Sequence, residues 1–317
     1  MKMKAAVCVR AGGPEVLELR EIPVPEVRQG WSLIRIRGAG LNRSELRTRQ
    51  GHSPTVTFPR VLGIECVGTV AASATLPEGT TVAAVMGELG RRFDGGYAEY
   101  ALIPDALLMP VKTTLPWPVL AALPETFLTA QGALDTLPLE PGGRLLIRGG
   151  TSSVGLAAAS IATALGVETA ATTRHATKTA ALTTDHALVD DGSLPEALRK
   201  IWPDGPDATL DLVGATTALE SLRLVRPGGT VCVAGSLSGW VIKDLEPIAM
   251  IPSGTRLTAF HSKTVQGDAP ALQRIVDAVE AGRYDSHLDR VFALEDIVAA
   301  HRVMENDESA GKLVAVP

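Results

Sequence analysis

The sequence predicts an α/β protein with two domains, a small all-β domain and a doubly wound parallel sheet. The chain of 317 residues is long enough to bury two separate cores. Residues 1–110 contain short apolar runs separated by Gly and Pro, without helical periodicity. After Leu120, six short apolar runs alternate with helical stretches, as in a parallel sheet that is covered on both faces.

The all-β part is expected to be a small barrel or sandwich, because its apolar runs are short and are bounded by turn residues. Its strands are predicted at residues 4–10, 17–25, 31–41, 63–72, 80–87 and 96–104.

The second part begins with a helical stretch at residues 119–137, which the Pro-Gly-Gly at 141–143 ends. The tail carries a helix at 270–284, a strand at 290–294, a further helix and a last strand at 312–316, and is expected to pack on the all-β domain. The parallel strands are predicted at residues 145–149, 168–173, 187–191, 208–213, 230–235 and 256–261.

The composition narrows the possible partners and the location. The chain is 45% hydrophobic and 21% charged, the balance of an ordinary folded protein. A net charge of −5 argues against nucleic acid or an anionic membrane as a partner. The sequence has no apolar run of about 18 residues and no signal-peptide pattern, so a cytoplasmic location is expected. The three cysteines are isolated, which excludes a zinc knuckle.

A glycine fingerprint follows the first parallel strand, in the stretch RGGTSSVG at residues 148–155. Aligned on G-x-G-x-x-G, its positions are Gly150, Ser152 and Gly155, and a helix follows. Serine in the middle is small, and Ser152 or Ser153 can donate to a phosphate or cap the helix, with Val154 beside them. The turn is therefore interpreted as a modified nucleotide cradle; the alternative is a Gly/Ser turn in a domain that binds no nucleotide.

The end of the second parallel strand indicates which nucleotide binds. An NAD enzyme keeps an acid about 20 residues after the fingerprint, for the ribose hydroxyl. This chain instead has Thr173 and Arg174 there, with Lys178 four residues further on. Cations and hydroxyls suit a 2′-phosphate, so the predicted cofactor is NADP(H); alternatively, both cations lie on a solvated face.

Several stretches together resemble the quinone oxidoreductase branch of the medium-chain dehydrogenase/reductases. They are GLNRSELRTRQG, FPRVLGIECVGTV, DGGYAEYALIP, GGTSSVGLAAASIATALG and AGKLVAVP, in matching order. The resemblance implies a GroES-like β-barrel catalytic domain, residues 1–117 and 262–317. It also implies a Rossmann doubly wound parallel sheet that binds NADP(H), residues 118–261, with the active site between the two domains.

The resemblance also indicates which metal ligands this chain lacks. Zinc alcohol dehydrogenases of the superfamily use a cysteine where this chain has Asn42, and a histidine where it has Ile64. No metal site is therefore predicted. Glu65 is interpreted as a structural anchor, and Asn42 as a polar group near the nicotinamide or the substrate. Arg47 stands where relatives often have a tyrosine and could stabilise an enolate, unless it is a solvated surface residue.

Further cofactor contacts are expected at the carboxyl ends of the later strands, where ligands of such sheets bind. By the resemblance, Thr129 lies beside the nicotinamide and Lys312 reaches the cofactor from the tail. The alternatives are a core threonine and a surface lysine. The strand-end residues expected to line the cofactor are Val213, Ala234, Gly235, Phe260, His261 and Ser262.

The sequence thus predicts an NADPH-dependent, zinc-independent oxidoreductase that transfers hydride to a quinone or an α,β-unsaturated carbonyl. Two alternatives stay open, an enoyl reductase of a biosynthetic pathway and a non-catalytic NADPH-binding protein. The predicted partner is a small-molecule quinone or enone, with neither nucleic acid nor membrane. A homodimer is expected, with the strands at 230–235 and 256–261 extending the sheet across a two-fold axis.

Overall fold

A computed structural model describes residues 1–239 and 241–317. The chain divides into two compact units, and each is described by itself. The division into a catalytic and a cofactor-binding domain stays a prediction. The first unit comprises Met1–Leu128, Lys263–Gly282 and Ser286–Pro317, and the second comprises Thr129–Ser262 and Arg283–Asp285.

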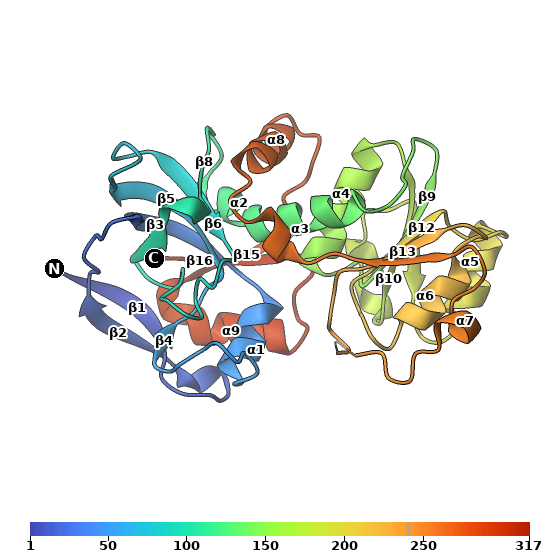
Figure 1. The fold of residues 1–317 in the computed structure, drawn as a ribbon, viewed down its shortest axis with the longest axis horizontal. Coiled ribbons are helices and arrows are strands. Elements are labelled where there is room, and N and C mark those ends of the chain that lie inside the picture. Colours follow the sequence, from blue (N-terminus) through green and yellow to red (C-terminus); the bar gives the residue numbers. More distant parts are fainter. Residues whose placement is uncertain (240) are drawn as a thin grey trace. The chain divides into compact units, whose positions relative to one another are not determined.

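The first unit is built on two β-sheets, as the sequence predicts (Figure 1). One has the strand order β2-β1-β4, and the other β15-β16-β3-β5-β6-β8, with β7 also paired to β3. The tail packs on this unit as expected, because β16 runs antiparallel to β3 with Val314 opposite Gly40. The strands are β1 (Lys2–Cys8), β2 (Leu17–Pro23), β3 (Trp31–Leu41), β4 (Arg60–Val61), β5 (Glu65–Ala72), β6 (Thr81–Val85), β7 (Tyr100–Pro104), β8 (Leu108–Pro110), β15 (Leu288–Ala293) and β16 (Lys312–Val316).

The predicted helical stretch at 119–137 forms two helices instead of one. Helix α2 (Trp117–Ala121) ends before Pro124, and α3 (Pro124–Leu134) begins there. Proline has no N–H for a preceding helix and is well suited to a first turn, which explains the break. Helix α1 (Arg43–Arg49) was not predicted from the sequence. The tail supplies α8 (Ala269–Glu280) and α9 (Ile297–Glu305).

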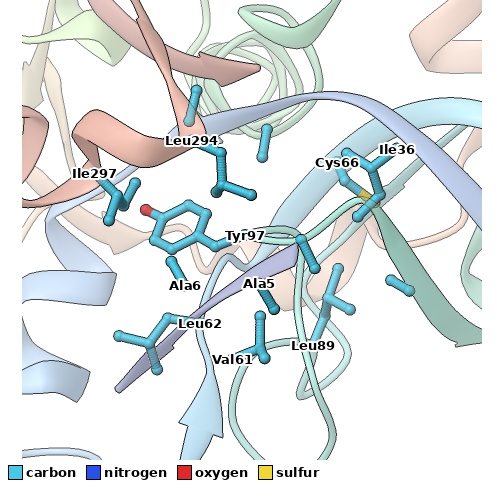
Figure 2. Packing of buried hydrophobic residues seen from close by; sticks show 14 of the residues in the cluster. Ala5, Ala6, Ile36, Val61, Leu62, Cys66, Leu89, Tyr97, Leu294 and Ile297 are labelled. Atoms are coloured by element: carbon cyan, nitrogen blue, oxygen red, sulfur yellow. The ribbon is translucent and has the colours of Figure 1, made fainter. Parts of the chain in front are cut away.

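The core of the first unit surrounds Tyr97, which is fully buried. Figure 2 shows its ring among small and branched apolar side chains, including Ala6 of β1 and Ile297 of α9. The small residues let the strand and the helix approach the ring closely, so packing fixes its position. The hydroxyl has no hydrogen-bond partner among the described residues.

The second unit contains a six-stranded parallel sheet of order β11-β10-β9-β12-β13-β14, which confirms the predicted doubly wound sheet (Figure 1). The strand order reverses at β9, whose neighbours are β10 and β12. Ligands of such sheets bind at the carboxyl ends of the strands beside this reversal. The strands are β9 (Arg144–Arg148), β10 (Glu168–Thr173), β11 (His186–Val189), β12 (Ala208–Asp211), β13 (Thr230–Val233) and β14 (Arg256–Ala259).

The helices of the second unit are less regular than the sequence predicts. The connection from β10 to β11 is a six-residue 3₁₀ helix (Ala176–Ala181), and α7 before β14 spans only Pro247–Met250. The first of these connections contains several threonines, which have low helix propensity. The remaining helices are α4 (Ser153–Ala164), α5 (Leu194–Ile201) and α6 (Ala218–Leu224). Within the described ranges, no helix has the length and apolar character needed to span a membrane.

Candidate functional site

The fingerprint turn joins β9 to α4 at the strand-order reversal. Gly149, not Gly150, takes the left-handed conformation of the turn, with φ of 80°. Gly155 lies against the turn, since a Cβ there would stand 2.6 Å from the Gly149 carbonyl oxygen. The third glycine of the fingerprint thus permits close packing of helix on strand. Gly150 is buried, and a Cβ there would meet Ala171 at 2.7 Å.

The two serines of the turn have different positions. Ser152 is the N-cap of α4, and its Oγ accepts a hydrogen bond from the Gly155 N–H at 3.1 Å. The same hydroxyl donates to the Gly149 carbonyl oxygen at 2.7 Å. Since its proton is used within the turn, Ser153 is the better candidate to donate to a phosphate. Both serines and Val154 are half-buried.

Replacing these serines should therefore have different effects. Ser152→Ala should lower the free energy of unfolding by about 1 kcal/mol, because the helix loses its cap. Ser153→Ala should keep stability and weaken NADPH and NADH equally, because both share the pyrophosphate. Urea unfolding and cofactor titration of the two variants measure this. Equal losses of affinity in both variants, without loss of stability, would contradict the division of roles.

The end of β10 lies directly beside the cradle. The Gly150 N–H donates to the Thr172 carbonyl at 2.8 Å, and Thr173 is the buried last residue of the strand. Arg174 follows and is exposed, while Lys178 is half-buried in the 3₁₀ helix. The structure thus places the predicted phosphate-binding cations at the same sheet edge as the cradle.

The other predicted cofactor residues of the second unit follow β12, β13 and β14 at this edge. The Asp211 side chain accepts hydrogen bonds from the N–H groups of Val213 and Gly214, both at 2.9 Å. The Asp211 carbonyl accepts from Ala234 at 3.0 Å and from Gly235 at 3.3 Å. These bonds hold two successive strand-end turns together.

Helix α3 approaches the same region through Phe260. A Cβ on Gly132 would stand 2.3 Å from the Phe260 ring, so helix and ring are in close contact. Thr129 precedes Gly132 on this helix and is 6% exposed. His261 is exposed and Ser262 is half-buried.

A second polar site lies in the first unit, where the resemblance places former metal-ligand positions. We call Asn42, Glu45, Glu65 and Lys312 the Lys312 cluster. The Lys312 Nζ lies 2.6 Å from Glu65 Oε1 and donates to Asn42 Oδ1, also at 2.6 Å. Asn42 Nδ2 donates to Glu65 Oε1 at 2.9 Å. The Lys312 side chain is 1% exposed and that of Glu65 is 0% exposed, so this is a buried ion pair.

These contacts refine several expectations. Glu65 anchors the chain as expected, since its Oε2 accepts from the Glu125 N–H of α3 at 2.9 Å. Lys312 lies inside the cluster, and its contact with a cofactor stays a prediction. Asn42 is half-buried and is held at both ends of its amide. Arg47 is half-buried on α1, about 200° around the helix axis from Glu45, so the cluster does not include it.

Glu45 was not among the residues predicted from the sequence. It stands three residues after Asn42, the N-cap of α1, in the spacing of a capping box. This spacing was the signal that could have found it. Its side chain turns into the core instead, where Oε1 accepts from the Ile64 N–H at 2.9 Å. Oε2 has no partner among the described residues, and burial raises the pKa of Glu45 to about 7.

The raised pKa of Glu45 predicts a pH effect on stability. A carboxyl group that binds its proton more tightly when folded stabilises the protein at low pH. This contribution is lost as the pH rises from about 4.3, the ordinary value for Glu, through about 7. Glu45→Gln imitates the protonated form. Its free energy of unfolding, relative to that of wild type, should therefore rise by roughly 1–3 kcal/mol between pH 5 and pH 8. Urea unfolding across this range measures the difference. Exposed Glu26→Gln is the control, and parallel profiles of Glu45→Gln and wild type would contradict the prediction.

Over the described residues, no group of three or more His, Cys, Asp or Glu side chains could hold a metal ion.

Comparison with protein families matches both parts of the chain. The alcohol dehydrogenase GroES-like domain matches residues 28–113, and the zinc-binding dehydrogenase family matches residues 180–314. A quinone oxidoreductase of Pongo abelii is 27% identical over 326 residues, 98% of this chain and 97% of the relative. The chain is a quinone oxidoreductase-like member of the medium-chain dehydrogenase/reductase superfamily.

Solved structures of similar proteins support this assignment and its NAD(P)-binding fold. A mycobacterial protein in complex with NADPH has a TM-score of 0.86 at 27% identity, over 99% of this chain and 100% of that chain. A protein described as an NAD-dependent alcohol dehydrogenase has a TM-score of 0.87 at 28% identity. The match covers 99% of this chain and 100% of that chain. The fold of this quinone oxidoreductase-like chain is therefore α/β, with a GroES-like domain and a Rossmann-type sheet.

Proposed function

We propose that this quinone oxidoreductase-like protein is an NADPH-dependent enzyme that transfers hydride to a quinone or an α,β-unsaturated carbonyl without a metal ion. The buried ammonium of Lys312 carries the proposal. It lies between Asn42 and Glu65, beside the two positions that hold metal ligands in zinc-dependent relatives. The two positions hold the amide of Asn42 and the apolar Ile64 instead of thiolate and imidazole, and the neighbouring ammonium would repel a divalent cation.

The choice of NADPH rests on the second unit. The turn at Gly149 and the close packing at Gly155 fit a bound pyrophosphate at the start of α4. Exposed Arg174 beside this turn suits a 2′-phosphate. A relative solved with NADPH supports the same choice, while the name of another relative specifies NAD.

The chemistry follows from what the chain can supply. When bound, the nicotinamide supplies a hydride. Without a Lewis acid, the acceptor must already be electrophilic, as quinones and conjugated carbonyls are. The amide of Asn42 is fixed by Lys312 and Glu65, and its exposed side can orient the nicotinamide or the substrate. Since both bonds hold the amide in one orientation, we assign Asn42 a positioning function.

The proposal is tested by NADPH consumption with a panel of quinones and enones. Turnover with members of this panel supports the proposal, whereas turnover only with acyl thioesters would identify an enoyl reductase. Binding of NADPH without turnover on either panel would identify a non-catalytic binding protein.

Removal of metal should leave the activity unchanged. Exhaustive dialysis against a chelator, with metal analysis before and after, should give the same kcat with the best substrate, because Lys312 supplies the positive charge beside Glu65. Stoichiometric zinc whose loss abolishes turnover and whose return restores it would overturn this part of the proposal.

We also propose a homodimer that forms at β14, the last strand of the parallel sheet. An edge strand leaves backbone groups available for pairing with a second copy. In the connection between β13 and β14, Val241 is 70% exposed and Ile248 is fully exposed, which supports a covered surface in solution.

A further inference from the structure

Arg148, the last residue of β9, is a buried cation directly before the cradle. Its Nε and Nη2 donate to Asp190 Oδ2 at 3.1 and 2.7 Å. Its Nη1 lies 2.7 Å from Glu220 Oε2 of α6 and also donates to Ser221 Oγ at 3.3 Å. One guanidinium therefore joins the carboxyl end of β9 to the end of β11 and to α6.

Asp190 lies next to the predicted 2′-phosphate position. It follows β11, and its N–H donates to the Thr173 carbonyl at 2.8 Å, directly before Arg174. Its side chain is 17% exposed. A free carboxylate here would repel a phosphate dianion and could accept hydrogen bonds from ribose hydroxyls, as the acid of NAD enzymes does.

The carboxylates around Arg148 keep its guanidinium charged beside Asp190. Burial alone would lower the pKa of Arg148, but the hydrogen bond to Asp190 and the charges of Asp190, Asp211 and Glu220 raise it. The guanidinium thus stays charged at every pH at which the protein is folded. Loss of the guanidinium would release two carboxylates, Asp190 and Glu220. The Glu220 side chain is 42% exposed and is screened by water, whereas Asp190 lies next to the predicted 2′-phosphate position.

We propose that Arg148 determines cofactor specificity, because its ion pair with Asp190 neutralises a carboxylate that would otherwise disfavour the 2′-phosphate of NADPH. This inference rests on the proposed NADPH-dependent function. It makes NADPH preference depend on a buried residue whose guanidinium contacts other side chains of the protein. Arg174 attracts the phosphate, and Arg148 removes a repulsion beside it.

The test compares dissociation constants of NADPH and NADH for wild type and Arg148→Met, which keeps an unbranched side chain without charge. The ratio of the two constants should move at least about fivefold toward NADH at low salt, and the shift should shrink at high salt. The double variant Arg148→Met/Asp190→Asn should return the ratio to within about twofold of wild type. Arg144→Met, at the opposite end of β9, is the matched control and should leave the ratio unchanged.

An unchanged ratio in folded Arg148→Met, or no recovery in the double variant, would overturn the proposal. A merely structural role would weaken both cofactors together. If Arg148→Met does not fold, Asp190→Asn alone decides: NADPH affinity relative to NADH should be kept or raised, and a fall would overturn the proposal. Failure of the proposed function is distinguishable, because wild type would then bind neither cofactor or prefer NADH.

Discussion

Lys312→Met should lower the free energy of unfolding of the first unit by about 3–5 kcal/mol, the usual loss when one partner of a buried ion pair is removed. The Glu65 carboxylate would remain at 0% exposure, and within the described residues only the Asn42 amide and the Glu125 N–H would still donate to it. Urea unfolding followed by circular dichroism measures the loss. Activity should fall as well, because Asn42 loses the ammonium that fixes its amide oxygen.

Two further variants show whether the loss comes from the buried charge. Lys112→Met removes an exposed lysine from the same unit and should change stability by less than about 0.5 kcal/mol. Lys312→Met/Glu65→Gln should recover at least half of the loss, since no unpaired carboxylate remains. If Lys312→Met keeps wild-type stability but binds NADPH more weakly, Lys312 contacts the cofactor, as the sequence analysis expected.

The strands were predictable from the sequence because local patterns determine them. Runs such as residues 31–41 and 230–235 combine β-branched residues with turn residues at their ends, and both contain strands of the structure. The carboxyl-end rule for parallel sheets then placed the strand-end residues at one edge. No tertiary information was needed for either step.

The Lys312 cluster was not predictable in the same way. Lys312 is far along the chain from the three other members, and β16 pairs with β3 only in the folded protein. A lysine near the end of the chain is usually solvated, so its burial against Glu65 depends on a long-range contact. Likewise, the capping spacing of Glu45 describes the isolated helix, whereas the Ile64 N–H turns its side chain into the core.

Arg174→Ala should weaken NADPH at least tenfold and leave NADH nearly unchanged. Arg174 follows β10 beside the cradle and is exposed, so it can reach the 2′-phosphate with its planar group. Hydrogen bonds to charged groups contribute about 1.5–3 kcal/mol each. At about 1.4 kcal/mol per factor of ten, this corresponds to roughly 10- to 150-fold in affinity.

Lys178 lies on the 3₁₀ helix that follows β10, and its replacement can be compared with that of Arg174. Lys178→Ala should produce the same shift to a smaller extent, because lysine acts as a point charge without the fork of arginine. The informative quantity is the ratio of the two dissociation constants, since general damage to the fold cancels in it. Rising salt should reduce the wild-type preference and both mutational shifts together. A wild-type preference for NADH, or a ratio that does not move in Arg174→Ala, would show that the cations at the end of β10 do not select the cofactor.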